Sequence, residues 1–269
     1  MRKKTEHGKE KQSTLLLRLF LVGVAILLLL SGILKVASII AKSTFDGTHR
    51  YTLLIQYNAK EVRAFSLSPQ DSTISVLSMS SKTTIYNARQ YLAIPVDAFI
   101  KNQNIPDSEN STQVLFYMLM HYRDFKQLTS IDLIRLWFYS RGIDQTNVSK
   151  REITYPYDVE KLDNISSSLF KDNAIVAENL NIQIINQTDV TGLGNRLSRV
   201  ISNMGGNVIS VESPDQLAKH SSITFVGSRG YTVSKLVKIT NYHSIPMQKK
   251  SFADIIITIG QDKENNEQF

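Results

Sequence analysis

Hydrophobic and polar positions along the chain mark one long apolar stretch near its beginning. From Leu19 the sequence runs LFLVGVAILLLLSGIL without a charged residue, and Lys35 is the one charged residue up to Ala41. About 20 apolar residues in a helix cross the ~30 Å hydrocarbon core of a bilayer. A lysine near the end of such a helix can extend its ammonium group to the interface. The pattern therefore predicts a transmembrane helix over residues 19–41.

A cleaved signal peptide and a buried helix of a soluble protein are the alternatives for this stretch. The apolar core of a signal peptide is about 7–15 residues long and is followed by a cleavage site with small residues. Here the core is longer, and the nearest candidate, Val36-Ala37-Ser38, is a poor site. We therefore favour an uncleaved single-pass anchor.

Short alternating runs after residue 42 predict strands, and longer periodic runs predict helices. A polar link, Ser43–Arg50, leads out of the membrane. The expected strands are Tyr51–Tyr57, Glu61–Leu67 and Thr73–Met79, joined by two hairpin loops, and the expected helices are Thr112–Tyr122 and Ser130–Ser140. The second helix has Ser130 as its predicted N-cap, and apolar positions nearly encircle it, so we expect it to be largely buried. The polar segment Arg141–Asn179 predicts an irregular connector with a domain boundary near residues 165–178.

The chain after residue 179 alternates between strand and helix patterns. The expected strands are Leu180–Ile185, Val208–Val211, Ile223–Val226 and Phe252–Ile259, and the expected helices are Gly192–Met204, ended by Gly205-Gly206, and Thr232–Thr240. The fold class is therefore α/β (α+β), with an N-terminal transmembrane helix followed by two small α/β modules. The predicted divisions are a disordered basic tail (1–18), the membrane helix (19–41), a first module (43–165), a linker (166–179), a second module (180–262) and a disordered tail (263–269).

The charge distribution gives the predicted anchor an orientation. The chain has 31 Lys and Arg against 24 Asp and Glu, a net charge of +7. Eight of the basic and two of the acidic residues lie in residues 1–42, which leaves +6 there and +1 for the rest. Basic residues before a membrane helix favour the cytoplasm, so we expect a cytoplasmic N-terminus and an extracytoplasmic remainder. This nearly neutral remainder argues against a nucleic-acid partner.

Cysteine is absent from the chain. Its absence excludes disulfides, thiolate nucleophiles, zinc fingers and iron–sulfur ligation. An exported part without cysteine, behind a basic cytoplasmic segment, favours a bacterial or archaeal envelope.

Residues Ile182–Asp262 resemble the C-terminal domain of LytR-CpsA-Psr cell-envelope proteins. The resemblance lies in INQTDVTGLGNRLSRVISNMGGNVISV (Ile185–Val211) and FADIIITIGQD (Phe252–Asp262). The family pattern is a strand, an Asn-x-Thr turn, Val-x-Gly-Leu, an amphipathic helix, a glycine turn and a strand, and it ends in Asp, a hydrophobic run and Gly-x-Asp. The motif positions, which we interpret as structural, are Asn186, Thr188, Gly192, Leu193, Gly206, Asp254, Gly260 and Asp262.

The first module is similar to a shortened, degenerate form of the catalytic domain of the same family. The similarity rests on FSLSPQDSTISVLSM (Phe65–Met79) and IPVDAFIK (Ile94–Lys101). Active members transfer polymers from a polyprenyl-pyrophosphate carrier to peptidoglycan, with arginines that bind the pyrophosphate and acidic residues that hold magnesium. Here Ser81 and Lys82 replace the Arg and Asp of the Pro-Arg-Asp-Thr motif. The resemblance thus implies a fold and a location, and speaks against the transferase activity.

Two further departures from the family pattern concern its charged residues. Lys60-Glu61 replaces an earlier Asp-Thr, and the later Arg135 and Arg141 are isolated rather than clustered. Both departures remove groups that would bind a pyrophosphate or its magnesium ion.

Other candidate chemistry in the sequence has a structural explanation. Gly192-Leu193-Gly194 lacks the third glycine of a dinucleotide motif and any Gly-Lys-Ser/Thr, which favours a tight strand-to-helix turn over a phosphate loop. We expect Asn186, Thr188 and Asp189 to form this hydrogen-bonded turn and helix entry. We expect no catalytic residue, metal site or cofactor. The five histidines are far apart in sequence, without metal-ligand spacing: His7, His49, His121, His220 and His243.

Aromatic residues are concentrated in one part of the first module. Trp137-Phe138-Tyr139, with Tyr117 and Tyr122, could form a carbohydrate or lipid platform, but we favour core packing because apolar positions nearly encircle the helix over residues 130–140.

The sequence as a whole favours a membrane-anchored, extracytoplasmic cell-envelope protein that is non-catalytic and binds or scaffolds at the cell wall. The expected partners are the membrane and peptidoglycan or other envelope components. Two alternatives remain: a phosphotransferase that attaches polyprenyl-pyrophosphate-linked polymers to peptidoglycan, and an envelope regulator that acts through protein contacts.

Overall fold

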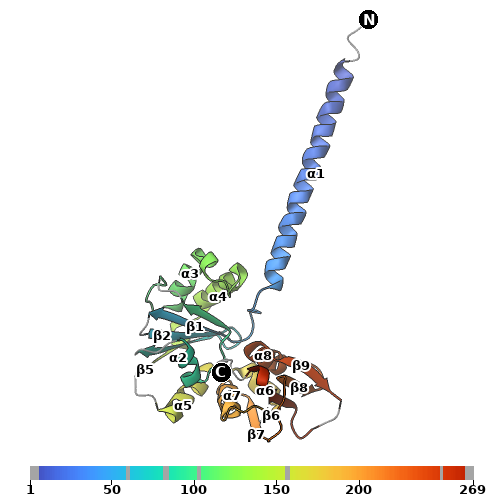
Figure 1. The fold of residues 1–269 in the computed structure, drawn as a ribbon. Helices are drawn as coiled ribbons and strands as arrows, with labels where there is room; N and C mark the ends of the chain where they lie inside the picture. The colour runs from blue at the N-terminus through green and yellow to red at the C-terminus, as the bar shows by residue number, and fades with distance from the viewer. Residues whose placement is uncertain are drawn as a thin grey trace.

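A long helix projects from two packed α/β modules in the computed structural model of the chain (Figure 1). The structure describes residues 6–58, 61–80, 85–101, 104–154, 158–248 and 251–263. Within the long helix α1 (Glu6–Ala41), the 25 residues Leu17–Ala41 are long and apolar enough to cross a membrane, and none is buried against the modules. A signal sequence also meets this criterion, so α1 is a single-pass anchor or a signal sequence by length and composition.

The basic segment that precedes the membrane helix differs from the sequence-based expectation. We predicted that residues 1–18 are disordered, whereas α1 begins at Glu6. Lysine, glutamate and glutamine are good helix formers, so the apolar helix extends backward through them. The prediction of disorder is wrong from residue 6 onward.

Two five-stranded sheets form the body of the described chain. The first module, residues 43–170, contains β1 (Tyr51–Asn58), β2 (Glu61–Ser68), β3 (Thr73–Ser80), α2 (Ile85–Leu92), β4 (Ala98–Lys101), α3 (Ser111–Met120), η1 (Tyr122–Asp124), α4 (Ser130–Gly142), η2 (Gln145–Asn147), β5 (Val148–Thr154) and α5 (Val159–Phe170). The second module, residues 172–263, contains α6 (Asn173–Glu178), β6 (Asn181–Asn186), α7 (Leu193–Asn203), β7 (Asn207–Glu212), β8 (Ser222–Val226), α8 (Tyr231–Thr240), β9 (His243–Met247), β10 (Ile255–Ile259) and η3 (Gln261–Lys263).

The first sheet has the strand order β4-β1-β2-β3-β5. The antiparallel pairs β1–β2 and β2–β3 confirm the two predicted hairpins, with Leu53 opposite Phe65 in the first pair. The edge strands β4 and β5 lie parallel to β1 and β3.

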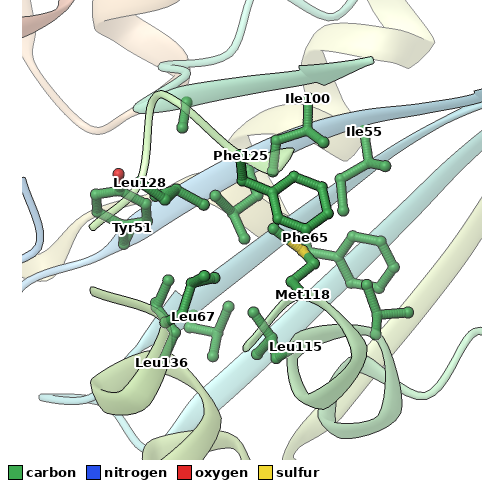
Figure 2. Packing of buried hydrophobic residues seen from close by; sticks show 14 of the residues in the cluster. Tyr51, Ile55, Phe65, Leu67, Ile100, Leu115, Met118, Phe125, Leu128 and Leu136 are labelled. Atoms are coloured by element: carbon green, nitrogen blue, oxygen red, sulfur yellow. The ribbon is translucent and has the colours of Figure 1, made fainter. Parts of the chain in front are cut away.

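Both faces of the first sheet are covered, which gives three layers. On one face, α3 and α4 close a core that Figure 2 shows from nearby, with side chains such as Phe65 and Leu67 packed against Met118 and Leu136. On the other face, Leu54 and Leu77 pack against α2 and α5. Side chains fill the space between sheet and helices on each side.

The second sheet has the strand order β7-β6-β10-β8-β9, with β10 antiparallel to β8 and the other neighbours parallel. Its core lies on one face, where Ile182, Ile257 and Ile223 contact the amphipathic helices α7 and α8 through Leu197 and Leu236. The predicted strands and helices of this part are confirmed within a few residues, except that β10 begins at Ile255 rather than Phe252. The edge strand β9 was not predicted.

The predicted irregular connector over residues 141–179 is wrong. This segment contains an entire edge strand, β5, and two helices, α5 and α6. Asp158 and Asp172 cap α5 and α6 by accepting hydrogen bonds from backbone N–H groups of their first turns. The many polar residues form the exposed sides of these helices, while Phe170 packs on the first sheet and Ile175 on the second.

The helix α4 differs from its prediction at its start and on its outer side. Its N-cap is Thr129 rather than Ser130, in a capping box with Asp132. Leu133 and Leu136 are buried, but Ile134 and Phe138 are 49% and 71% exposed. The expectation of all-round burial is therefore wrong, because only one side of α4 faces the sheet.

Candidate functional site

A buried carboxylate paired with two lysines lies where the two modules meet. Asp97, just before β4, has a fully buried side chain and lies within 2.9 Å of Lys235 Nζ and 2.8 Å of Lys238 Nζ, both from α8. Burial alone would raise the pKa of Asp97, but the two ammonium groups hold this pKa below its usual range. The cluster thus keeps a charged group inside the protein by pairing it.

The donors of this cluster are used within the protein. Lys235 Nζ donates to both oxygens of Asp97 and to the carbonyl oxygen of Arg50, at 2.9–3.0 Å. Lys238 Nζ donates to the carbonyl oxygen of Thr44 at 2.7 Å and lies 4.6 Å from the ring centre of Tyr51. These contacts join α8 to the chain that leaves α1 and to the first sheet, so the arrangement acts as a clamp.

A small cavity of about 140 Å³ adjoins the clamp. Its lining includes Asp46, His49, Tyr231 and Lys238. Pockets for drug-sized ligands span roughly 300–1,000 Å³, so this cavity has room for water or a small ion rather than a lipid-linked substrate.

Ionic and aromatic contacts support the wall of the cavity. The rings of His49 and Tyr231 stack with centroids 3.8 Å apart. Burial works to raise the pKa of Asp46, yet hydrogen bonds from His49 and Thr48 lower this pKa to about 2. Glu178 accepts hydrogen bonds from the backbone N–H groups of Tyr231 and Thr232 at 2.7 Å, at the start of α8, which favours a negative charge.

The segment between α1 and β1 is fixed by a second buried carboxylate. Asp132 Oδ1 accepts hydrogen bonds from Ser43 Oγ and from the backbone N–H groups of Thr44 and Phe45, at 2.6–3.0 Å. Its Oδ2 accepts from the N–H and hydroxyl groups of Thr129. The pKa of Asp132, which burial would raise, is lowered by these hydrogen bonds. The polar link predicted over residues 43–50 is thus held against α4, with Phe45 buried in the first core.

A third cluster joins the modules on the side of α5 and α7. Arg199 Nε and Nη2 donate to the two oxygens of Asp163 at 2.9 and 2.8 Å, a bidentate pair. Asn203 Nδ2 donates to the carbonyl oxygen of Ala93 and to Asp163. The two modules are therefore joined at more than one place.

The predicted motif positions near the start of α7 fix a turn. Asn186 Nδ2 donates to the carbonyl oxygen of Val190, and Thr188 Oγ1 donates to Asn186 Oδ1. These contacts form the hydrogen-bonded turn expected from the sequence. Gly192 has a φ of +86° at the N-cap, and Leu193 is buried in the second core.

The other glycines of this motif lie where chain segments approach closely. A Cβ on Gly194 would come within 2.8 Å of Val211 Cγ1, so this glycine permits close packing of α7 on the sheet. A Cβ on Gly206 would lie 2.5 Å from Ile201 Cγ2, in the turn after α7. Close packing within the second module therefore explains both glycines, without a role in binding phosphate.

The remaining motif positions join the ends of strands. Asp254 Oδ2 accepts from the backbone N–H of Asn181, which aligns β10 with β6. Asp262 Oδ1 accepts from the N–H and hydroxyl groups of Ser221, and the same hydroxyl accepts from the Gly260 N–H. Each of these positions thus has an intramolecular contact that explains its residue type.

Some residues compared with the family's catalytic motifs lie outside the described residues, namely Lys60, Ser81 and Lys82. Arg135 donates to the carbonyl oxygen of Phe45, and the Arg141 guanidinium lies 5.0 Å from the ring centre of Trp137. In the described ranges no group of three or more His, Asp or Glu side chains could hold a metal ion.

The aromatic residues of the first module are only in part core residues. Tyr117 and Trp137 are partly buried against the first core. Tyr122, Phe138 and Tyr139, however, are 43%, 71% and 36% exposed, so the preference for core packing is wrong for these three. Phe138 lies on the outer side of α4, away from the sheet, and Tyr122 lies in η1, just after α3.

Sequence reasoning missed the residues of the clamp. Lys235 had a detectable signal, because it is spaced by three and four residues from Thr232 and Ile239, both buried on α8. A lysine on the inward side of a predicted helix requires a buried partner. The partner itself, Asp97, is 138 positions away in the chain.

Comparison of the chain with protein-family models, with curated proteins and with solved structures gives no match. The resemblance to LytR-CpsA-Psr proteins therefore stays a prediction from the residues quoted above.

Proposed function

We propose that the protein is a single-pass membrane protein of a bacterial envelope that holds its two modules outside the cytoplasm and acts there by binding or scaffolding. The apolar span in α1 and the basic residues before it support the anchor and its orientation. The near-neutral charge of residues 43–269 suits a partner other than a polyanion.

The observation that carries this proposal is the fixed connection between the anchor and the modules. Asp132 binds residues 43–45 from α4, and Lys238 binds Thr44 from α8. Both modules therefore contact the short segment that leaves the membrane helix. A protein built this way presents its surfaces at a set distance and orientation from the membrane, which suits a scaffold.

Filled cores favour a non-catalytic role. Transfer from a polyprenyl carrier needs a deep apolar groove with cations at its mouth, since the pyrophosphate charge must be neutralised. The space between the first sheet and α3–α4 is instead filled by side chains such as Phe65, Met118 and Phe125 (Figure 2).

Topology can be tested with single-cysteine variants because the chain has no cysteine. In intact cells we expect a membrane-impermeant maleimide to label Leu217→Cys, in the second module, and to label His7→Cys only after permeabilisation. The reverse pattern, or loss of residues 1–41 from the mature chain, would contradict the anchor and its orientation.

Binding can be tested with the full chain in detergent. We expect purified cell-wall sacculi to retain it above a detergent-solubilised control membrane protein, and equal retention would overturn the cell-wall role. A tight magnesium-dependent affinity for polyprenyl pyrophosphate would instead support the phosphotransferase alternative.

A further inference from the structure

The outer side of the α3–α4 hairpin carries a group of exposed apolar side chains. The inner sides of both helices, with Leu115 and Leu133, belong to the first core. On the outer sides, residues at four-residue spacing share one face of each helix. Tyr122, in η1 just after α3, is exposed as well. We call the following exposed residues the α3–α4 apolar face: Phe116, Met120, Tyr122, Ile134 and Phe138.

Partly buried aromatic contacts connect the two halves of this face. The Phe116 ring on α3 lies 5.7 Å from the Trp137 ring on α4, centroid to centroid. Phe138, at 71% exposure, is the most exposed large hydrophobic residue among those described. Exposed apolar groups that adjoin one another mark interaction sites more often than scattered ones do.

The α3–α4 apolar face adjoins the end of the apolar span. In Figure 1, α3 and α4 lie beside the C-terminal end of α1, on the side of the modules from which α1 projects, and α1 contacts α4. Tyr122 has a lowered pKa through a hydrogen bond and the charge of Arg123, and Lys35 of α1 adds to this effect. The contact between α1 and α4 therefore places the hairpin beside the end of the apolar span.

The chemistry of the hairpin suits the boundary between headgroups and acyl chains. Aromatic rings with polar tips favour this boundary, and basic side chains favour lipid phosphates. Residues 111–142 contain four basic and two acidic side chains. One of the acidic two, Asp132, is buried, while Arg123, Lys126 and Arg141 are exposed.

We infer that the α3–α4 apolar face inserts into the outer leaflet of the membrane that α1 spans, with Tyr122 and Trp137 at headgroup level. This inference rests on the proposal that α1 remains as an anchor. The hairpin then forms a second membrane contact beside the helix, and the two contacts together set the tilt of the modules.

The experiment uses the full chain in vesicles of phosphatidylcholine and phosphatidylglycerol. Phe138→Cys and the matched control Phe252→Cys, which replaces a 64% exposed phenylalanine of the second module, each receive one environment-sensitive fluorophore. We expect blue-shifted emission at position 138, quenched several-fold more strongly by lipids brominated near the headgroup than emission at position 252. In the unsubstituted chain, the single tryptophan, Trp137, should show the same quenching.

The outcomes separate this inference from the anchor itself. If the protein floats with the vesicles but both labels report water, the inference is overturned and the anchor stands. If the label at position 138 is blue-shifted yet insensitive to brominated lipid, a second copy or another protein surface covers the face, which also overturns it. If the chain does not float with the vesicles, the anchor fails, and the inference fails with it.

Discussion

Lys235 Nζ lies 2.9 Å from both carboxylate oxygens of Asp97, although the two residues are 138 positions apart in the chain. The pair joins α8 of the second module to the segment before β4 in the first. The side chains are 5% and 0% exposed. At such burial the removal of Lys235 leaves the Asp97 carboxylate with Lys238 as its one remaining ammonium partner, in a poorly polarisable environment.

Lys235→Met is therefore expected to destabilise the protein strongly. Asp97 would retain Lys238 as its one ammonium partner, and breaking a buried pair costs about 3–5 kcal/mol. The free energy of unfolding can be measured by urea denaturation in detergent. As a control, Lys150→Met removes an exposed ion pair with Glu109 and is expected to cost about 0–1 kcal/mol.

The double variant Asp97→Asn/Lys235→Met tests the cause of this loss. If the buried carboxylate, left with Lys238 as its one ammonium partner, is responsible, the double variant should be more stable than Lys235→Met alone. Equal stability of the two variants would show that lost packing, rather than buried charge, accounts for the effect.

Acid should destabilise the protein through the two buried carboxylates. The pKa values of Asp97 and Asp132 are both below the usual value in the folded chain. The unfolded chain, with Asp pKa values of about 3.9, then binds protons first as the pH falls. The stabilisation is complete above about pH 4 and is lost as the pH falls through the folded values.

The midpoint of thermal unfolding as a function of pH measures this effect. In Asp132→Asn, the midpoint should be lower at neutral pH and should fall less steeply in acid, because one carboxylate no longer contributes. A slope in acid equal to that of the unsubstituted chain would contradict a role for Asp132.

Replacement of Asp132 should also release the segment after α1. Its Oδ1 accepts the backbone N–H groups of Thr44 and Phe45. Hydrogen bonds to a charged group contribute about 1.5–3 kcal/mol, so Asp132→Ala should speed amide hydrogen exchange at these two positions by about tenfold or more. Asp254→Ala, which frees the N–H of Asn181 in the second module, is the control and should leave residues 44 and 45 unchanged.

Elements with one apolar side and clear end signals could be predicted from the sequence. The strands β1–β3 are short apolar runs that are separated by turn residues. The helix α7 has its apolar residues at helical spacing and is followed by Gly205-Gly206. In α5 and α6 the same signals exist, with Asp158 and Asp172 as N-caps. The high content of Asp, Asn and Ser concealed them, because polar residues on the exposed side of a helix resemble a loop in composition.

The site residues were harder to predict because they depend on contacts between distant segments. Neither Asp97 nor Asp132 belongs to a local motif that requires burial. The lysine partners of Asp97 and the partners of Asp132 in residues 43–45 lie in other elements. The exposed side of α4 was missed for a related reason: apolar residues around the whole helix do not show which side meets the sheet, and Phe138 lies on the other side.

Gly260→Ala should lower the stability of the protein, whereas Gly142→Ala should leave it unchanged or raise it. A Cβ on Gly260 would lie 2.6–2.9 Å from backbone atoms of His220, which cannot move aside as a side-chain end can, whereas a Cβ on Gly142, the last residue of α4, would meet nothing within 4 Å. Overpacking costs typically about 1–3 kcal/mol, and alanine is favoured over glycine in helices by up to about 1 kcal/mol. For a chain of this size, 1 kcal/mol shifts the thermal midpoint by about 2–4 °C. The midpoint should therefore fall for Gly260→Ala and stay level or rise for Gly142→Ala, and a midpoint of Gly260→Ala at or above that of the unsubstituted chain would contradict the close approach at His220.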